Sequence, residues 1–398
     1  MENKNEWKKV KLKDVIDFNP KEILKKGTIA KYIEMANLQC FQKNILKYEI
    51  REYKGGTKFR NGDTLLARIT PCLENGKTGF IDFLDENEVA FGSTEYIILR
   101  EKNEVTDKNF IYYLSISEGF RNLAIKSMSG TSGRQRVQID ALLEAEIFLP
   151  PLIIQKKIAK ILSNIDSKIE LNNKINNNLE KQAQLIFKSW FVDFEPFKDL
   201  EVLSWKKDIL GNLVTIRRGS SPRPIQNYLS KNGFNWLKIS DVSNLTSPFV
   251  FKTQEKIKKE GLKKTVLLSS GDLVVSNSAT PGIPKILNTH CCIHDGWLYF
   301  TNSIFSNEFL YLFFKYKKNE LVTFGNGSVF TNLKTDILKN IEIFIPPKEI
   351  LNEFNKIIKP IFKMILSSSQ EVNKLINLKN YLLPKLMNGE IDVEKIEL

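Results

Sequence analysis

The sequence predicts an α+β protein in which two strand-rich domains are separated by two long helices, packed antiparallel as a coiled coil with pseudo-twofold symmetry. Two observations carry this prediction. The 398-residue chain repeats itself after about 196 residues, a period far longer than the roughly 20–50 residues of a solenoid repeat. Each copy also ends in a long segment whose apolar residues recur every three or four positions, as in an amphipathic helix. A duplicated domain followed by a duplicated helix suggests one task performed at two places on one partner.

Four pairs of segments, spread over the whole chain, carry the repeat. They are Glu6–Leu12 with Ser204–Leu210, Gly62–Leu66 with Gly271–Val275, Asn109–Tyr113 with Glu308–Leu312, and Glu146–Pro151 with Glu342–Pro347. Because the pairs keep their order, the duplication covers a whole domain. We therefore divide the chain into a domain at 1–151, a helix at 152–200, a domain at 201–347 and a helix at 348–398. At this length each domain can bury a core of its own.

Short apolar runs bounded by turn residues predict the elements of the first domain. The expected elements are strands at Thr64–Ile69, Glu95–Leu99 and Ala145–Leu149, a helix that opens at Phe110 and a loop at Gly130–Gly133. Two prolines stop the last strand, because proline cannot donate to a strand ladder. The second domain is expected to repeat these elements.

The two helical segments carry matched apolar stripes. The stripes comprise Ile154, Ile158, Ile161, Ile165, Ile169, Leu179, Ile186 and Trp190 in the first segment, and Ile350, Phe354, Ile357, Ile361, Ile365, Val372, Leu375 and Leu382 in the second. Residues 152–191 would form a helix of roughly 60 Å, at about 1.5 Å per residue. Each helix must bury its stripe, and the other copy, running antiparallel, is the nearest candidate. Asparagines between 172 and 178 dilute the first stripe, and such residues on a coiled-coil seam fix its register.

Charge and composition narrow the class of protein. The 59 lysines and arginines against 46 acidic residues give a net charge of +13. This charge predicts a polyanionic partner, with a lysine- and asparagine-rich proteome as the alternative explanation. The sequence contains no run of about 18 apolar residues, so we expect no membrane span. The N-terminus lacks the apolar core of a signal peptide. Cys40, Cys72, Cys291 and Cys292 imply no disulfide framework. We therefore expect a cytoplasmic protein.

The sequence lacks the motifs of common enzymes. Gly76-Lys77-Thr78 resembles the end of a phosphate-binding loop, but Pro71 replaces the glycine needed five residues earlier. No Gly-x-Gly-x-x-Gly follows a predicted strand, and the Asp/Asn-Pro-Pro-aromatic tetrapeptide of adenine methyltransferases does not occur. His290–His294 holds both histidines, but its ligands are too crowded for one zinc ion, and it corresponds to the buried strand expected at Glu88–Phe91. We expect no catalysis, cofactor or metal from this chain alone.

Basic and small polar residues gather in loops next to predicted strands. Glycine-rich loops let backbone N–H groups approach phosphates, and Arg and Gln can make bidentate contacts to guanine and adenine edges. The candidate DNA-binding residues are Arg68, Thr70, Lys77, Arg134, Gln135 and Arg136 in the first domain and Arg217, Arg218, Ser220, Arg223, Ser276 and Ser278 in the second. Where the first domain has Arg68 and Lys77, the second has small polar groups and Lys285. Equivalent scaffolds with different tips would read different bases; solvated basic loops and ordinary turn chemistry are the alternatives.

Several of these segments resemble the specificity subunits of type I restriction–modification enzymes, and together they cover almost the whole chain. They are Phe59–Thr78 and Phe91–Tyr96, which resemble a target-recognition-domain segment, Leu149–Leu152 before Gln155, which resembles the opening of the first family helix, Ile186–Phe197, which resembles its end, and Leu382–Ile391, which resembles the C-terminal signature. One departure is that Ile350–Phe354 lacks the Pro-Pro-x-x-x-Gln form of the first copy.

The resemblance implies a non-catalytic subunit that supplies DNA specificity. Its two target recognition domains would bind a bipartite site in double-stranded DNA, with one half-site each. The paired helices would set the spacer and dock two copies of the modification subunit, which carry the methyl donor and flip the target adenine. A restriction subunit, a translocase–nuclease, would complete the complex. We expect docking near Trp190, Phe191, Leu386 and Met387, since these bulky side chains exceed what a two-helix seam needs.

Two other classes stay open at this point. One is an enzyme, either a stand-alone methyltransferase or an endonuclease with unfamiliar motifs, and the other is a duplicated scaffold with no role on DNA. The missing donor-binding loop argues against the methyltransferase. Steeply salt-dependent duplex binding would separate a DNA-binding protein from a scaffold.

Overall fold

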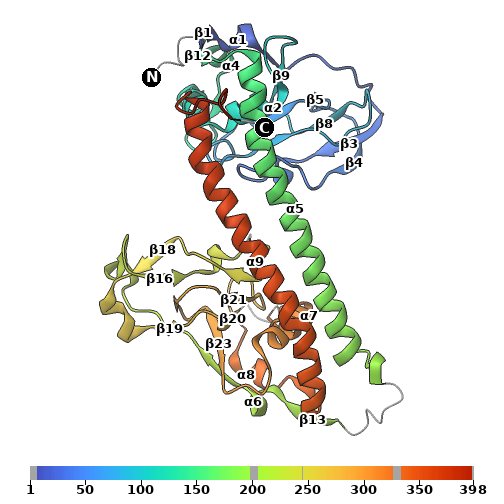
Figure 1. The fold of residues 1–398 in the computed structure, drawn as a ribbon, viewed down its shortest axis with the longest axis vertical. Coiled ribbons are helices and arrows are strands. Elements are labelled where there is room, and N and C mark those ends of the chain that lie inside the picture. Colours follow the sequence, from blue (N-terminus) through green and yellow to red (C-terminus); the bar gives the residue numbers. More distant parts are fainter. Residues whose placement is uncertain (1–6, 198–204, 244, 326–332, 397–398) are drawn as a thin grey trace. The chain divides into compact units, whose positions relative to one another are not determined.

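The computed structural model describes residues 7–197, 205–243, 245–325 and 333–396, which form two compact units. The first unit comprises residues 1–170 and 373–398, and the second unit comprises residues 171–372. Each contains one strand-rich domain with parts of the two long helices, α5 (Leu152–Phe191) and α9 (Lys348–Met387) (Figure 1). The predicted α+β class is confirmed. The predicted division at residue 200 lies outside the described residues, and the other domain boundaries stay a prediction.

The first unit contains two four-stranded sheets. Their strands, in spatial order, are β2 (Ile16–Phe18), β9 (Tyr96–Glu101), β6 (Thr64–Ala67) and β7 (Thr78–Phe80) in one sheet, and β4 (Glu49–Glu52), β3 (Ile29–Ile33), β8 (Ala90–Gly92) and β5 (Thr57–Phe59) in the other. All neighbours are antiparallel except β3 and β8. The strand predicted from Thr64 ends at Ala67, because the chain turns into a loop there.

The second unit repeats this topology with one extra strand in each sheet. The orders are β14 (Thr215–Arg218), β23 (Trp297–Thr301), β20 (Leu273–Ser276), β21 (Pro284–Leu287) and β17 (Phe249–Val250), and β15 (Leu229–Ser230), β18 (Glu255–Ile257), β16 (Phe234–Leu237), β22 (Cys291–Ile293) and β19 (Val266–Leu268). Parallel β16 and β22 match parallel β3 and β8. The strand expected at His290–His294 is therefore confirmed as β22.

The first and last strands of each domain pair with one another, which explains the repeated Trp-Lys-Lys segment. The pairs are β1 (Lys8–Lys11) with β12 (Glu146–Leu149) and β13 (Lys206–Ile209) with β24 (Glu342–Ile345). In equivalent registers Lys9 lies opposite Phe148 and Lys207 lies opposite Phe344. Each domain thus closes on itself immediately before its long helix begins.

Smaller helices and a hairpin complete the two domains. They are α1 (Leu12–Val15), α2 (Lys108–Ile116), α3 (Glu118–Lys126) and α4 (Ile139–Leu143) with the hairpin β10 (Met128–Ser129) and β11 (Arg136–Val137) in the first unit, and α6 (Leu210–Leu213), α7 (Asn307–Gly325) and α8 (Thr335–Lys339) in the second. Neighbouring strand residues face opposite layers. Leu66 packs in the core shared with α2 and α5, whereas Leu65 packs in the core between the sheets.

The repeated Gly-Asp sequence forms the same turn before β6 and before β20. Gly62 and Gly271 have φ values of 91° and 98°, a left-handed conformation that glycine adopts without steric cost. The carboxylate of Asp63 accepts the Arg60 N–H, and that of Asp272 accepts the Ser269 N–H, both at 2.8 Å. The turn sets where each central strand starts and hence where its end meets the neighbouring loops.

The two long helices begin where the sequence predicts, at Leu152 and Lys348, and pack together in each unit. In the first unit the Lys379 ammonium lies 2.6 Å from the Asp166 carboxylate. In the second unit the amides of Asn172 and Asn176 donate to Glu371 and Ser369, at 3.0 and 3.2 Å. The partners on α9 fall in number as those on α5 rise, so the predicted antiparallel packing is confirmed. Both asparagines are buried, as expected for polar residues that fix a register.

The first long helix has Gln155 near its start, whereas the second has Leu351 at the corresponding position. The structure gives a local explanation for this difference. Gln155 is fully buried, and its amide donates to the carbonyls of Pro150 and Val105 while its carbonyl accepts the Asp107 N–H. These bonds tie the first turn of α5 to its own domain. The buried apolar side chain of Leu351 occupies the corresponding place in α9, so packing anchors the second helix without the glutamine.

Candidate nucleic-acid interface

Two loops distant in sequence meet beside the end of β6 in the first unit. The Thr70 N–H donates to the Gln135 carbonyl at 3.0 Å, and the Val137 N–H donates to the Arg68 carbonyl at 2.9 Å. The Thr70 hydroxyl donates to the same Gln135 carbonyl at 3.2 Å. The structure therefore brings together four of the predicted DNA-binding residues, Arg68, Thr70, Gln135 and Arg136, on one surface.

A carboxylate that the sequence analysis did not single out organises this surface. The Arg136 guanidinium donates to Glu95 through Nη2 at 2.7 Å and through Nε at 3.0 Å. The hydrogen bond from Arg136 and the charges of Arg136 and Arg68 lower the pKa of Glu95. The Glu95 carbonyl also accepts the Arg68 N–H at 3.0 Å. Glu95 thus holds both loops and fixes the direction of one guanidinium.

The two remaining candidates of the first unit lie in different surroundings. Arg134 is exposed on the hairpin loop between Gly130 and Arg136, where its side chain can reach a ligand. The Lys77 ammonium is half-buried and donates to the Met35 carbonyl at 2.8 Å. Lys77 is therefore placed to support its own loop, and a contact with DNA would require this bond to be given up.

In the second unit, Asp295 lies close to two of the three predicted arginines, Arg218 and Arg223. Its carboxylate accepts the Ser221 hydroxyl at 2.6 Å and lies 3.6 Å from Arg223 Nη2 and 3.9 Å from Arg218 Nη2. Its carbonyl accepts the Arg218 Nε–H. The Ser221 hydrogen bond is the main cause of its lowered pKa. Ser220, exposed in the same loop, donates its backbone N–H to Ile293 at 3.2 Å.

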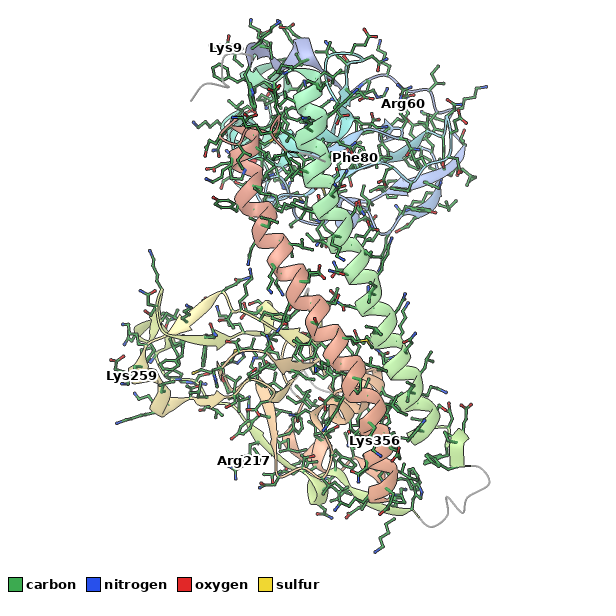
Figure 2. All side chains as sticks on the ribbon, in the orientation of Figure 1. Lys9, Arg60, Phe80, Arg217, Lys259 and Lys356 are labelled. Atoms are coloured by element: carbon green, nitrogen blue, oxygen red, sulfur yellow. The ribbon has the colours of Figure 1, made fainter. Side chains whose placement is uncertain are left out.

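Three candidates of the second unit separate from this cluster. Neighbouring strand residues point to opposite faces of a sheet, so Arg217, exposed on the surface (Figure 2), faces away from Arg218. Ser276 is 0% exposed, and its hydroxyl donates to the Thr280 carbonyl and accepts the Ile283 N–H. This hydroxyl therefore closes its own loop, and a contact of Ser276 with DNA stays a prediction. Ser278 is half-buried in that loop.

The two surfaces occupy equivalent places. Tyr96 lies opposite Ala67 in the strand register, as Trp297 lies opposite Ser276. The residues that follow, Arg68 and Asn277, accept the N–H of Val137 and Leu333 in the same way. Residues 326–332, which precede Leu333, lie outside the part of the chain that the structure describes. The signal that sequence reasoning missed is an acidic residue just before each strand that carries the buried aromatic.

The helix-end residues predicted to bind a partner also make contacts within the chain. Phe191 contacts Phe354 and Phe309 with ring centroids 4.7 and 5.0 Å apart. Trp190 contacts Phe197 at 5.5 Å, and Leu386 is 1% exposed. These side chains pack against the domains on which the helices end, and Phe191 stays partly exposed. Docking of a partner at Trp190, Phe191, Leu386 and Met387 stays a prediction.

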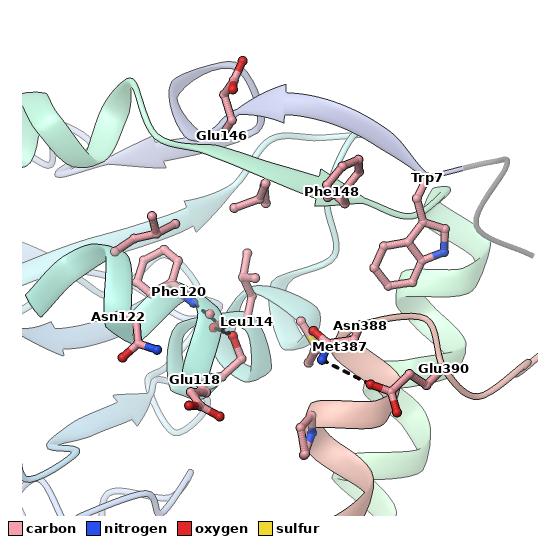
Figure 3. A pocket seen from close by; sticks show the side chains of 15 residues that line it. Trp7, Leu114, Glu118, Phe120, Asn122, Glu146, Phe148, Met387, Asn388 and Glu390 are labelled. Atoms are coloured by element: carbon pink, nitrogen blue, oxygen red, sulfur yellow. Dashed lines mark hydrogen bonds between the residues drawn. The ribbon is translucent and has the colours of Figure 1, made fainter. Parts of the chain in front are cut away.

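Met387 lines a groove of about 640 Å³ in the first unit (Figure 3). Trp7 and Phe148 form one side of the groove, and Glu390 and Asn388 lie at the helix end. Phe148 is 65% exposed. In the second unit the ring of Phe194 fills the corresponding space, 5.4 Å from Trp205 and 5.5 Å from Phe344. The groove therefore exists because Glu390 stands where the second unit has an aromatic side chain.

No metal-binding group of three or more His, Cys, Asp or Glu is assembled among the described residues. Cys291 and Cys292 are buried in β22, and burial raises the pKa of their thiols to about 12 and about 11. None of the described helices is both long and apolar enough to cross a bilayer. What the two units share is a scaffold that presents loops at the corresponding sheet edge, and the chain is therefore a duplicated two-unit protein.

Comparison with known families identifies the class. The model of the type I restriction modification DNA specificity domain matches residues 4–181 and 203–378, and the chain therefore belongs to this family. It is a DNA specificity subunit of a type I restriction–modification system, which is non-catalytic within the complex. Family membership decides against the stand-alone enzyme and the scaffold without a role on DNA.

Relatives match over most of the chain. It is 27% identical to the specificity subunit of the HindI type I restriction enzyme of Haemophilus influenzae, over 86% of this chain and 90% of that one. It is 28% identical to the MjaIX specificity subunit of Methanocaldococcus jannaschii, over 72% and 70%. The S subunit structure from M. genitalium superposes with a TM-score of 0.61 over 97% of each chain at 17% identity, and this likeness supports the fold.

Proposed function

We propose that this chain binds a bipartite site in double-stranded DNA, with one half-site read by each domain. Residues 1–151 form the first target recognition domain and residues 201–347 the second, and the helices at 152–200 and 348–398 fix the spacer between half-sites. The main supporting observation is that arginines lie beside a carboxylate at the corresponding sheet edge of each unit. These arginines are Arg136 in the first unit and Arg218 and Arg223 in the second. The equivalent position and the different side chains suit one task performed on two sequences.

The chemistry of the loops supports recognition of base edges as well as phosphates. A guanidinium held by a carboxylate presents its remaining N–H groups in a fixed direction, which suits bidentate contact with a guanine edge. Arg134, Arg217 and Ser220 are exposed, and they suit phosphates, which tolerate variable geometry. The net charge of +13 favours binding to a polyanion in general.

Double-stranded DNA binding is tested with the purified complex of this chain and its modification subunits. We expect a steep decrease in duplex affinity with salt, because each neutralised phosphate releases counterions. Arg136→Ala should cost about 1–3 kcal/mol at one base position, whereas Arg134→Ala should weaken all sequences alike. Mapping the methylated adenines in host DNA identifies the site. Equal affinity for all duplexes at every salt concentration would refute the proposal.

Two copies of the modification subunit are proposed to dock on α5 and α9, with a restriction subunit, a translocase–nuclease, completing the complex. Apolar side chains that remain exposed on these helices support docking there. They are Ile153, Leu171, Ile175 and Leu185 on α5 and Ile357, Met364, Ile376, Leu378 and Tyr381 on α9. Such a row of exposed apolar groups is typical of a surface that a partner helix covers. Trp190 and Met387, both partly buried, would contribute only at the edge of this surface.

The docking surface can be tested without disturbing the core. Leu171 and Ile175 lie one helical turn apart and are 52% and 42% exposed, so replacing both by Glu should leave thermal unfolding unchanged. We expect the variant to lose co-purification of the modification subunit. Lys181→Glu, an exposed change on the same helix, is the matched control and should assemble normally. Normal assembly of the Leu171/Ile175 variant would exclude this surface.

A further inference from the structure

Each unit places one carboxylate at the edge proposed to face DNA. Glu95 directly precedes β9, and Asp295 lies two residues before β23. The two strands are equivalent, because Tyr96 pairs with Ala67 as Trp297 pairs with Ser276. A carboxylate close to phosphates is repelled by them, so an acidic group here lowers affinity for DNA in general. Its presence in both units calls for a function other than affinity.

The arginines that these carboxylates hold come from different elements. Arg136 belongs to β11, whereas Arg218 ends β14 and Arg223 lies in the loop that follows. The duplication therefore did not simply copy one ion pair. The two carboxylates are offset by one residue, because Glu95 corresponds to Gly296. Each nevertheless lies within two residues of the equivalent buried aromatic, and each has a different arginine beside it. In both units the loop before the strand of the buried aromatic thus supplies a carboxylate to an arginine, although neither the acidic position nor the arginine is the same.

The geometry at Glu95 suits orientation of a side chain. Nε and Nη2 of Arg136 both donate to the carboxylate, so the plane of the guanidinium is fixed while its Nη1 edge stays free of this bond. Asp295 is engaged by Ser221 at 2.6 Å and stands 3.6 Å from Arg223. The Arg218 Nε–H bonds the Asp295 carbonyl, which leaves its Nη2 near the carboxylate at 3.9 Å.

We propose that Glu95 and Asp295 are positioning residues for sequence discrimination. Each orients the neighbouring arginine toward a base edge. Each also disfavours duplexes in which no base contact of the arginine offsets the repulsion between the carboxylate and the phosphates. This inference rests on the proposed function. Its distinctive consequence is that removal of the charge moves two affinities in opposite directions. Specific duplex should bind more weakly because the arginine is no longer oriented, and non-specific duplex should bind more tightly because repulsion is relieved.

The test uses Glu95→Gln and Asp295→Asn in the complete complex with the modification subunits. Affinities for a duplex carrying the methylated motif and for a scrambled duplex of equal length are measured at several salt concentrations. We expect the ratio of specific to non-specific affinity to fall about tenfold, within the range of one well-made base contact. Glu144→Gln, which removes an exposed ion pair with Lys11 and Lys13, is the control and should leave the ratio unchanged.

A double-variant comparison separates positioning from a structural role. If Glu95 acts through Arg136, Glu95→Gln should cause little further loss of discrimination in an Arg136→Ala background. Glu95→Asp, which keeps the charge, should restore part of the ratio. A parallel fall of both affinities, or an unchanged ratio, would overturn this inference while the wild-type complex still discriminates. A wild-type complex that fails to discriminate would instead overturn the proposed function.

Discussion

The strands β7 and β21 hold equivalent places in the two units, and at one equivalent position β7 has Gly79 where β21 has Lys285. Gly79 lies opposite Leu65 and Lys285 opposite Val274 in the same register. A Cβ on Gly79 would lie 2.8 Å from the side chains of Leu38 and Ile45, so apolar groups fill that space. Lys285 fills it with its own chain and donates to the carbonyls of Leu245 and Ser247 at 2.7 and 2.5 Å.

The difference shows which features of the duplicated domain are fixed and which vary. Strand order, register and the Gly-Asp turn are common to both units, whereas buried side chains at equivalent positions differ in size and polarity. Backbone pairing can hold the scaffold while cores and loops change separately, since sheet register is set by the alternation of buried positions. A scaffold of this kind would permit each domain to recognise a different half-site, as proposed above.

The largest expected effect concerns the buried aromatic residues Tyr96 and Trp297. Trp297→Ala should destabilise the chain by about 3–5 kcal/mol, because it leaves a large cavity and removes the bond from Trp297 Nε1–H to the Leu237 carbonyl at 3.0 Å. Tyr96→Phe should be neutral or stabilise by up to about 1 kcal/mol, because its hydroxyl is buried without a partner. Denaturant unfolding measures both. A large cost for Tyr96→Phe would show that the two positions are more alike than the structure indicates.

Lys285 should make stability depend on pH. Burial and the nearby Lys315 charge lower its pKa from 10.5 to about 7. Between these values the unfolded chain binds more protons than the folded chain, so the free energy of unfolding should rise as pH increases from about 7 toward 10. Lys285→Met should flatten this rise, and Lys252→Met, at an exposed lysine, should not. Unfolding at pH 7, 8 and 9 checks the slope; equal slopes in both variants would argue against a depressed pKa.

How far the sequence predicts this molecule depends on the separation of the interacting residues. The existence and the starts of α5 and α9 followed from a stripe repeated over many turns. The meeting of Glu95 with Arg136 joins residues 41 apart in the chain, and no spacing rule reveals it. The packing of Phe191 against Phe309 and Phe354 is likewise a tertiary contact that periodicity does not identify.

The helix ends offer a smaller test of the comparison. Glu390→Phe should fill the groove beside Trp7 and Phe148 and stabilise the chain by about 1 kcal/mol, the size of an added aromatic contact. Phe194→Ala should open the corresponding space in the second unit. It should destabilise the chain by about 1–3 kcal/mol, which is less than the loss of a core aromatic side chain. Thermal unfolding of the two variants measures the changes. Destabilisation by Glu390→Phe would show that the groove differs in shape from the site of Phe194.

The smallest effects are expected at the ion pairs that both units share. Lys9 pairs with Glu146 at 2.6 Å and Lys207 with Glu342 at 2.5 Å, all four side chains being largely exposed. Each Lys→Met change should alter stability by less than about 1 kcal/mol, with the difference shrinking at high salt. Unequal costs at the two sites would reveal a contact that the duplication did not copy.

The most direct test of the central claim is an exchange of domains. Residues 204–347 are replaced by the corresponding domain of another specificity subunit, and methylated adenines are mapped in host DNA before and after the exchange. If each domain reads its own half-site, one half of the methylated motif changes while the other half and the spacer stay the same. A change in both halves, or in neither, from an assembled and active complex would contradict the account.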